Sequence, residues 1–254
     1  MQISKLTLLL AAAGLITPLL CLAQSPAIDN RAASTAARAA TPVNDSVVSA
    51  QELKMSGKAE PAFRKGTDLL LRGDARGSLV QFERALDEDP SYYRAYHNLG
   101  LAQYRLGEKE LAEKAFQRAI DLTNGGFAPS QFALAMILFE KRQFRQAEAL
   151  IQHGLDMDPG SALGKYLLGV VQFALNLLPD AERSAHDALR RSANQAEAHI
   201  LLAKIHERRG DPYAVQADVA AYLKLYPHGP LEHEANALLQ RAQEEISRRA
   251  DASR

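Results

Sequence analysis

The chain has 254 residues, 47% of them hydrophobic, and it carries 30 basic and 30 acidic side chains. The length suits one or two folded domains. A neutral total charge provides no long-range attraction for nucleic acid or anionic lipid, which argues against nucleic acid as a partner. Alanine, leucine, glutamate, arginine and glutamine dominate the middle of the chain and favour helices, because these side chains lose little freedom in a helix.

The N-terminus has the pattern of a secretory signal peptide. Lys5 precedes an almost wholly apolar run that extends from Leu6 to Cys21, and Cys21 and Ala23 are small residues around a predicted cleavage site. The sequence therefore predicts a signal peptide over residues 1–23, cleavage after Ala23, and a periplasmic or secreted mature protein.

Two alternatives remain for this segment. The apolar run could be retained as a membrane anchor, although it is shorter than the roughly 20 residues of a spanning helix. Cys21 could carry a lipid, but Leu20 stands where lipoprotein signals have a small residue. If the segment is removed, the mature chain has no cysteine and must fold in an oxidising compartment without disulfides.

The region that follows, residues 24–58, is predicted as a disordered linker with an extended lead-in. Its first part is rich in alanine, serine, threonine and asparagine, and has too few large apolar residues to offset its ordering entropy. Its last part, Val47 to Met55, mixes apolar and polar residues and is expected to lie extended against the structure that follows.

From residue 59 onward the sequence repeats itself with a period of 34 residues. The interval separates four pairs of identical residues: Gly66 and Gly100, Gly73 and Gly107, Phe82 and Phe116, and Ala85 and Ala119. Proline continues the pattern at Pro90, Pro159 and Pro227. Self-similarity at such a period indicates a repeat architecture, in which stacked units share one core.

The residues at these positions resemble the tetratricopeptide repeat family. The clearest unit contains Ala95-Tyr96-His97-Asn98-Leu99-Gly100, followed by Tyr104, Gly107, Ala112, Phe116 and Ala119. The resemblance implies an all-α fold, an α-solenoid of about five helix pairs over residues 59–229. The units are 59–92, 93–127, 128–161, 162–195 and 196–229. A C-terminal capping helix is predicted over residues 230–250, where Leu231, Ala235, Leu238, Leu239 and Ala242 form one apolar stripe.

Turn and cap residues support paired helices. Turns are expected at Gly73, Gly107, Asn176 and Gly210, since glycine and asparagine accept the left-handed conformation that ends a helix. The third unit lacks this signal and has Arg142-Gln143 instead. Asp74 and Asp211 suit helix N-caps, and Pro212 suits a first helical position.

Three glycines lie inside predicted helices, where glycine costs about 1 kcal/mol relative to alanine. Gly66, Gly100 and Gly169 are therefore expected where paired helices approach closely. The small residues expected opposite them are Ala112, Ala147, Ala181 and Ala188.

The sequence contains no recognised catalytic motif, so the protein is predicted not to be an enzyme and to need no cofactor, metal or small-molecule substrate. A metal-dependent hydrolase is the remaining catalytic alternative. It would use His199, His206, His228 or His233, but their spacing supplies no third or fourth ligand.

The family resemblance implies that the first helix of each pair lines a concave groove that holds a protein or peptide partner. An apolar surface of this kind is typical of an interaction site. A chaperone-like holder of exported chains is the alternative, and the groove could also be filled by its own aromatic residues or by Val47 to Met55. The residues expected in the groove are Phe63, Leu70, Arg94, His97, Leu101, Tyr104, Phe132, Met136, Phe139, Tyr166, Val170, Phe173 and Lys204.

Overall fold

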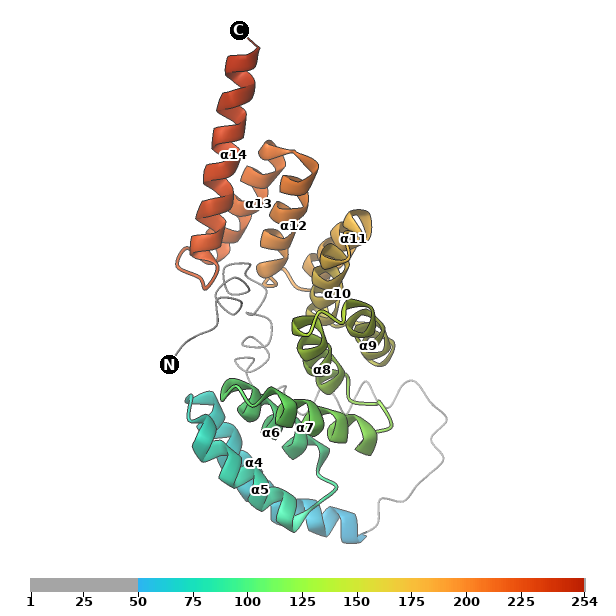
Figure 1. Ribbon diagram of the computed structural model, residues 1–254. Helices are drawn as coiled ribbons and strands as arrows, with labels where there is room; N and C mark the ends of the chain where they lie inside the picture. The colour runs from blue at the N-terminus through green and yellow to red at the C-terminus, as the bar shows by residue number, and fades with distance from the viewer. Residues whose placement is uncertain (1–49, 254) are drawn as a thin grey trace. The chain divides into compact units, whose positions relative to one another are not determined.

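The computed structural model describes residues 50–253, which form eleven helices and contain no strand (Figure 1). The prediction of an all-α helical repeat is therefore confirmed. The described residues divide into two compact units, residues 50–133 and residues 134–253. The predicted signal peptide and residues 24–49 of the predicted linker lie outside the described residues.

The first unit consists of two helix pairs and the start of a third. Its helices are α4 (Ala50–Leu71), α5 (Ala75–Glu88), α6 (Tyr93–Arg105), α7 (Lys109–Leu122) and the beginning of α8 (Ala128–Glu140), which ends in the second unit. Within each pair the helices pack together, α4 on α5 and α6 on α7, and α6 also packs on both α4 and α5. This is the stacking that a repeat needs in order to share a core.

Helix α4 starts at Ala50, nine residues before the predicted start of the first repeat. Part of the segment expected to be an extended lead-in is therefore helical. Residues 50–58 contain no β-branched residue and favour a helix, and Pro61 lies inside α4. A proline inside a helix removes one backbone hydrogen bond and crowds the carbonyl four residues earlier, yet α4 continues past Pro61 to Leu71.

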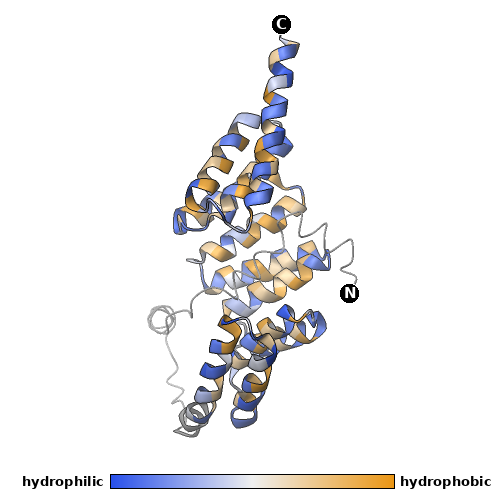
Figure 2. Cartoon of the chain, turned by 90° about the vertical axis from the view of Figure 1, so that its left-hand side faces the viewer, coloured by the Kyte–Doolittle hydropathy of each residue, from blue (hydrophilic) through white to orange (hydrophobic). Residues whose placement is uncertain are grey.

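The second unit contains α9 (Phe144–Met157), α10 (Ala162–Ala174), α11 (Leu178–Arg191), α12 (Glu197–Arg209), α13 (Pro212–Leu225) and α14 (Glu232–Ala252). Helix α14 packs on both α12 and α13. Its apolar stripe joins a core that includes Val219 and Tyr222. The C-terminal turns of α14 are largely hydrophilic (Figure 2), as expected for the end of a repeat stack. The predicted capping helix is thus present at 232–252.

Four of the turns between paired helices contain a residue in the left-handed conformation. Gly73, Gly107 and Gly210 have φ values of 87°, 83° and 70°, and Asn176 has φ 61°. The third repeat, which lacks the sequence signal, makes the turn with Arg142 at φ 60°. The turn is therefore retained there despite the cost of a left-handed conformation for a residue with a Cβ atom.

The predicted helix caps are present. The Asp74 side chain accepts a hydrogen bond from the Gly77 amide at 2.8 Å, and Asp211 accepts one from the Ala214 amide at 3.0 Å. Pro212 is the first residue of α13. Ser161, which the sequence analysis did not single out, caps α10 by accepting from the Gly164 amide at 3.0 Å.

The helical glycines lie at close approaches, as predicted, but at two of the three the partner is not a small residue. A Cβ atom on Gly66 would lie 2.7 Å from the ring of Phe82, and one on Gly100 would lie 2.7 Å from the ring of Phe116. A phenylalanine of the second helix, not a small residue, therefore occupies the space in these two pairs. Gly169 lies against the carbonyl oxygen of Ala181, which is one of the predicted small residues, and against the side chain of Leu201.

No helix within residues 50–253 is both long enough and apolar enough to cross a membrane.

Candidate binding surface on the first helices

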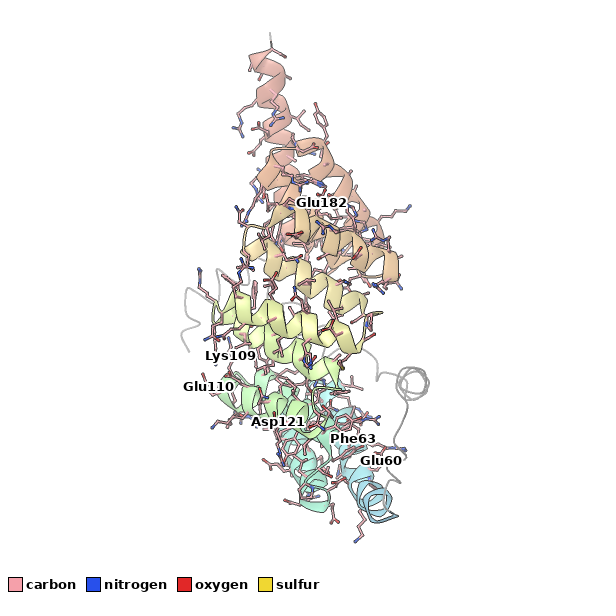
Figure 3. All side chains as sticks on the ribbon, turned by 90° about the vertical axis from the view of Figure 1, so that its right-hand side faces the viewer. Glu60, Phe63, Lys109, Glu110, Asp121 and Glu182 are labelled. Atoms are coloured by element: carbon pink, nitrogen blue, oxygen red, sulfur yellow. The ribbon has the colours of Figure 1, made fainter. Side chains whose placement is uncertain are left out.

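The first helices of neighbouring pairs, α4 and α6, are joined by polar contacts. The Asn98 amide nitrogen donates to the Thr67 hydroxyl oxygen at 3.0 Å. The Tyr92 hydroxyl, next to the start of α6, donates to Glu60 Oε2 at 2.6 Å, and Phe63 lies one turn further along α4 (Figure 3 labels Glu60 and Phe63). These contacts fix α4 and α6 side by side, so their free sides form one surface.

The predicted groove residues of the first unit fall into two groups. Phe63, Arg94 and Tyr104 keep part of their side chains exposed. Phe63 also packs on the ring of Tyr92, with centroids 4.9 Å apart. The buried group consists of Leu70, His97, Leu101 and Phe132.

His97 is part of an aromatic cluster. Its ring lies 5.6 Å from that of Phe116 and 5.3 Å from that of Phe127, and its Nδ1 is 3.0 Å from the Ser130 hydroxyl oxygen. Burial lowers the pKa of His97 to about 4, so the imidazole is neutral at pH 7. The side chain holds α6 against α7 and the start of α8, and it presents little surface to a partner.

In the second unit the predicted residues on α8 and α10 are apolar and buried. Met136, Phe139, Tyr166, Val170 and Phe173 are all less than 10% exposed. On α10 every residue from 166 to 173 is buried, which covers all sides of the helix. The Gln172 side chain, polar within this run, accepts a hydrogen bond from the Ser184 hydroxyl at 2.7 Å. The apolar character expected of this stretch is present, with little of it exposed.

The first-helix surface becomes charged toward the C-terminus. Lys204 on α12 pairs with Glu234 on α14 at 2.5 Å, and both side chains are 14% exposed. Glu207 on α12 pairs with Arg241 on α14 at 2.6 Å. Lys204, the predicted groove residue on α12, is therefore held in an ion pair with the neighbouring helix α14.

Two arginines that the sequence analysis missed connect successive first helices. Arg105 on α6 donates to the backbone carbonyl of Leu70 at the end of α4. In the other unit, Arg208 on α12 donates to the carbonyl of Phe173 at the end of α10, at 3.1 Å. Each arginine follows its acceptor by 35 residues, one more than the repeat period. That shared offset was a detectable signal.

The metal-site alternative gains no support from the described residues. His206 contacts Asp218 and Glu182, whereas the His228 side chain is 91% exposed and 3.5 Å from Glu232. Within residues 50–253, no three histidine, cysteine, aspartate or glutamate side chains are placed to hold a metal ion together.

Comparison with known proteins identifies the repeats. Models of the tetratricopeptide repeat match residues 63–127 and residues 138–205, which together make up about half of the chain. The chain is a tetratricopeptide repeat protein. Proteins with these repeats generally act as scaffolds for protein–protein interaction, not as enzymes.

The curated relatives share only the repeat region. DnaJ homolog subfamily C member 7 of Mus musculus is 26% identical over 145 residues, which are 53% of this chain and 29% of that protein. An uncharacterised protein of Methanocaldococcus jannaschii is 35% identical over 63 residues, 25% of this chain and 73% of that protein. The chain thus spans less than a third of the mouse relative.

Solved structures of other proteins share this fold. PilF of Pseudomonas aeruginosa aligns with a TM-score of 0.64 and 15% identity, over 77% of this chain and 93% of that one. A thermophilic tetratricopeptide repeat protein of Thermus thermophilus aligns with a TM-score of 0.60 and 22% identity, over 74% and 98%. YrrB, described as having an unusual peptide-binding site, aligns with a TM-score of 0.53 and 16% identity, over 74% and 95%. At these identities the likeness establishes the fold alone.

Proposed function

We propose that this protein is an exported, non-enzymatic scaffold that binds a protein or peptide partner on its first helices. The observation that carries the proposal is the arrangement of α4 and α6, which lie side by side with Phe63, Arg94 and Tyr104 partly exposed. Aromatic and arginine side chains are enriched at protein interfaces, because they combine a large contact area with hydrogen bonding. The repeat fold, shared with a protein described as having a peptide-binding site, supports the same assignment.

Site-directed photo-crosslinking in the native cell envelope tests this surface. A benzophenone amino acid replaces Tyr104 on the first helix α6. The matched control replaces Tyr213, which is 65% exposed and lies on α13, the second helix of its pair. We expect a discrete crosslinked partner from position 104 and none from position 213. Equal crosslinking from both positions, or crosslinking from 213 alone, would refute binding on the first helices.

The breadth of binding separates a selective scaffold from a chaperone-like holder of exported chains. The full chain is applied to an array of overlapping peptides from the crosslinked partner and from unrelated exported proteins. A selective scaffold binds a few peptides of the partner. Binding that follows peptide hydrophobicity alone, without regard to source, would favour the holder.

The proposed export rests on the sequence of residues 1–23 and is tested separately. Fractionation of expressing cells, followed by intact-mass measurement, should yield a chain that begins at Gln24 in the periplasm or the medium. Recovery of a chain that still contains residues 1–23 in the membrane fraction would favour the anchor, and recovery in the cytoplasm would refute export.

A further inference from the structure

His206 connects three helices of the second unit. It lies on α12, with 17% of its side chain exposed, and α12 packs on both α11 and α13. Its Nδ1 is 2.7 Å from Asp218 Oδ2 on α13. Its Nε2 is 3.4 Å from Glu182 Oε1 on α11 (Glu182 is labelled in Figure 3). Both ring nitrogens therefore face carboxylates, one from each neighbouring second helix.

The number of hydrogen bonds that the His206 ring can donate to these carboxylates depends on the charge of the ring. An ionised carboxylate only accepts hydrogen bonds, and a neutral imidazole has one N–H to donate. The neutral ring can satisfy Asp218, at the shorter distance, but its Nε2 lone pair then faces Glu182. The protonated ring donates to both carboxylates. Uptake of one proton thus adds a charge-assisted hydrogen bond between α11 and α12.

The surrounding charges favour the ionised form of Glu182, which can only accept hydrogen bonds. Burial opposes ionisation of Glu182, but its hydrogen bond with Arg209, at 2.7 Å, and the nearby His206 together hold its pKa below the usual value. Burial raises the pKa of Asp218, although His206, His199 and His186 act against that rise.

The other titratable groups near the site come from the same helices. On α12, burial lowers the pKa of His199. His186 of α11 adds to this shift, and the charge of Asp218 opposes it. Lys204 precedes His206 by two residues, about 200° around the helix, and pairs with Glu234 on α14. The charges of α14 therefore act on a different side of α12. Histidine is the side-chain type that normally changes charge between pH 5 and 8.

We propose that His206 is a pH-operated clamp between the fourth and fifth repeats, in which protonation joins α11 to α12 and α13. The protonated ring closes this junction, whereas the neutral ring releases the hydrogen bond to Glu182. Since this role concerns the packing of repeats, it goes beyond partner binding and does not depend on the proposed groove.

Amide hydrogen exchange of the full chain at pH 7.5 and 5.5, corrected for intrinsic exchange rates, tests the clamp. We expect protection of α11 and α12 to rise by roughly three- to tenfold at pH 5.5, from the gain of one charge-assisted hydrogen bond. His206→Gln should abolish the rise, because glutamine retains polar contacts but does not titrate. The matched control His233→Gln changes an exposed histidine of α14 and should leave the rise intact.

Glu182→Gln provides a second test through the opposite partner. It keeps the shape of the side chain and removes the charge that the imidazolium would meet, so the pH-dependent rise should again disappear. A rise that persists in His206→Gln and in Glu182→Gln would overturn the proposal. So would an equal or greater protection of α11 and α12 at pH 7.5 in the wild-type chain.

Discussion

The guanidinium of Arg208 holds Phe173 in two ways. It donates to the Phe173 backbone carbonyl at 3.1 Å, and its central carbon lies 3.8 Å from the centroid of the Phe173 ring. Phe173 belongs to the last turn of α10, where carbonyl groups lack partners within the helix and carry partial negative charge. The Phe173 carbonyl also accepts from the Asn176 amide at 3.0 Å in the turn that follows α10. Arg208 therefore adds a second hydrogen bond to the end of one first helix from the next one, and at the same time covers its last aromatic ring.

This double contact predicts a measurable loss of stability in Arg208→Ala. We expect the free energy of unfolding to fall by about 1–2 kcal/mol, combining a charge-assisted hydrogen bond with a cation–π contact near solvent. Arg208→Lys should recover only part of the loss, since an ammonium group cannot stack on the ring while donating to the carbonyl. Urea unfolding followed by circular dichroism measures both variants.

The control is Arg183→Ala, which removes an arginine that is 70% exposed and pairs with Asp180 on the same helix. Exposed pairs of this kind contribute about 0.2–0.5 kcal/mol. If Arg208→Ala and Arg183→Ala lower stability equally, the contact with Phe173 contributes nothing beyond an ordinary surface charge.

A second prediction concerns Gly100→Ala. The added methyl would meet the ring of Phe116 at 2.7 Å, and Phe116 is fully buried and cannot move aside freely. We expect a loss of about 1–3 kcal/mol from overpacking, measured by urea unfolding. In the double variant with Phe116→Leu the two losses should be less than additive, because the smaller side chain makes room for the methyl.

The matched control for Gly100 is Gly57→Ala on α4. A Cβ atom there meets nothing within 4 Å, so alanine should stabilise the helix by roughly 0.5–1 kcal/mol through its higher helix propensity. Destabilisation by both substitutions alike would show that the ring of Phe116 is not the cause.

The elements that the sequence predicted correctly are those set by local chemistry. Asp74 and Asp211 cap helices because a carboxylate at that position accepts from the next free amides, whatever the surrounding fold. The prediction of a small residue opposite Gly100 was wrong, because the spacing shows that two helices approach closely but not that the ring of Phe116 enters the gap.

The candidate surface was harder to predict for the same reason. His97 occupies a position that the family resemblance assigns to the groove, and its burial depends on Phe127, at the end of its repeat, and on Ser130 in the next repeat. The Arg208 contact depends on the direction of a long side chain across 35 residues. Exposure of a repeat position is decided by its neighbours in space, and a single repeat's sequence does not specify them.

A third prediction uses the turn of the third repeat. Arg142 has φ 60°, in the region that disfavours residues with a Cβ atom by about 1–2 kcal/mol. Arg142→Gly should relieve this strain but also increases the flexibility of the unfolded chain, so the net gain expected in urea unfolding is roughly 0.5–1 kcal/mol. The reciprocal variant, Gly107→Ala, places a Cβ atom at φ 83° and should destabilise. A loss of stability in Arg142→Gly would show that the arginine side chain contributes more than its backbone strain costs.

The fourth prediction is a pH dependence caused by His97. Burial lowers its pKa from 6.5 to about 4 in the folded chain, so the unfolded chain takes up the proton first as the pH falls. The stability that neutral His97 provides is complete above about pH 6.5 and is lost progressively toward pH 4, by roughly 2–3 kcal/mol. His97→Gln does not titrate, so it should lack this part of the acid sensitivity. The measurement is the difference in unfolding free energy between wild type and variant at pH 7 and at pH 4.5, which cancels the carboxylates common to both. A difference that stays constant with pH would mean that His97 is not held neutral by its burial against Phe116 and Phe127.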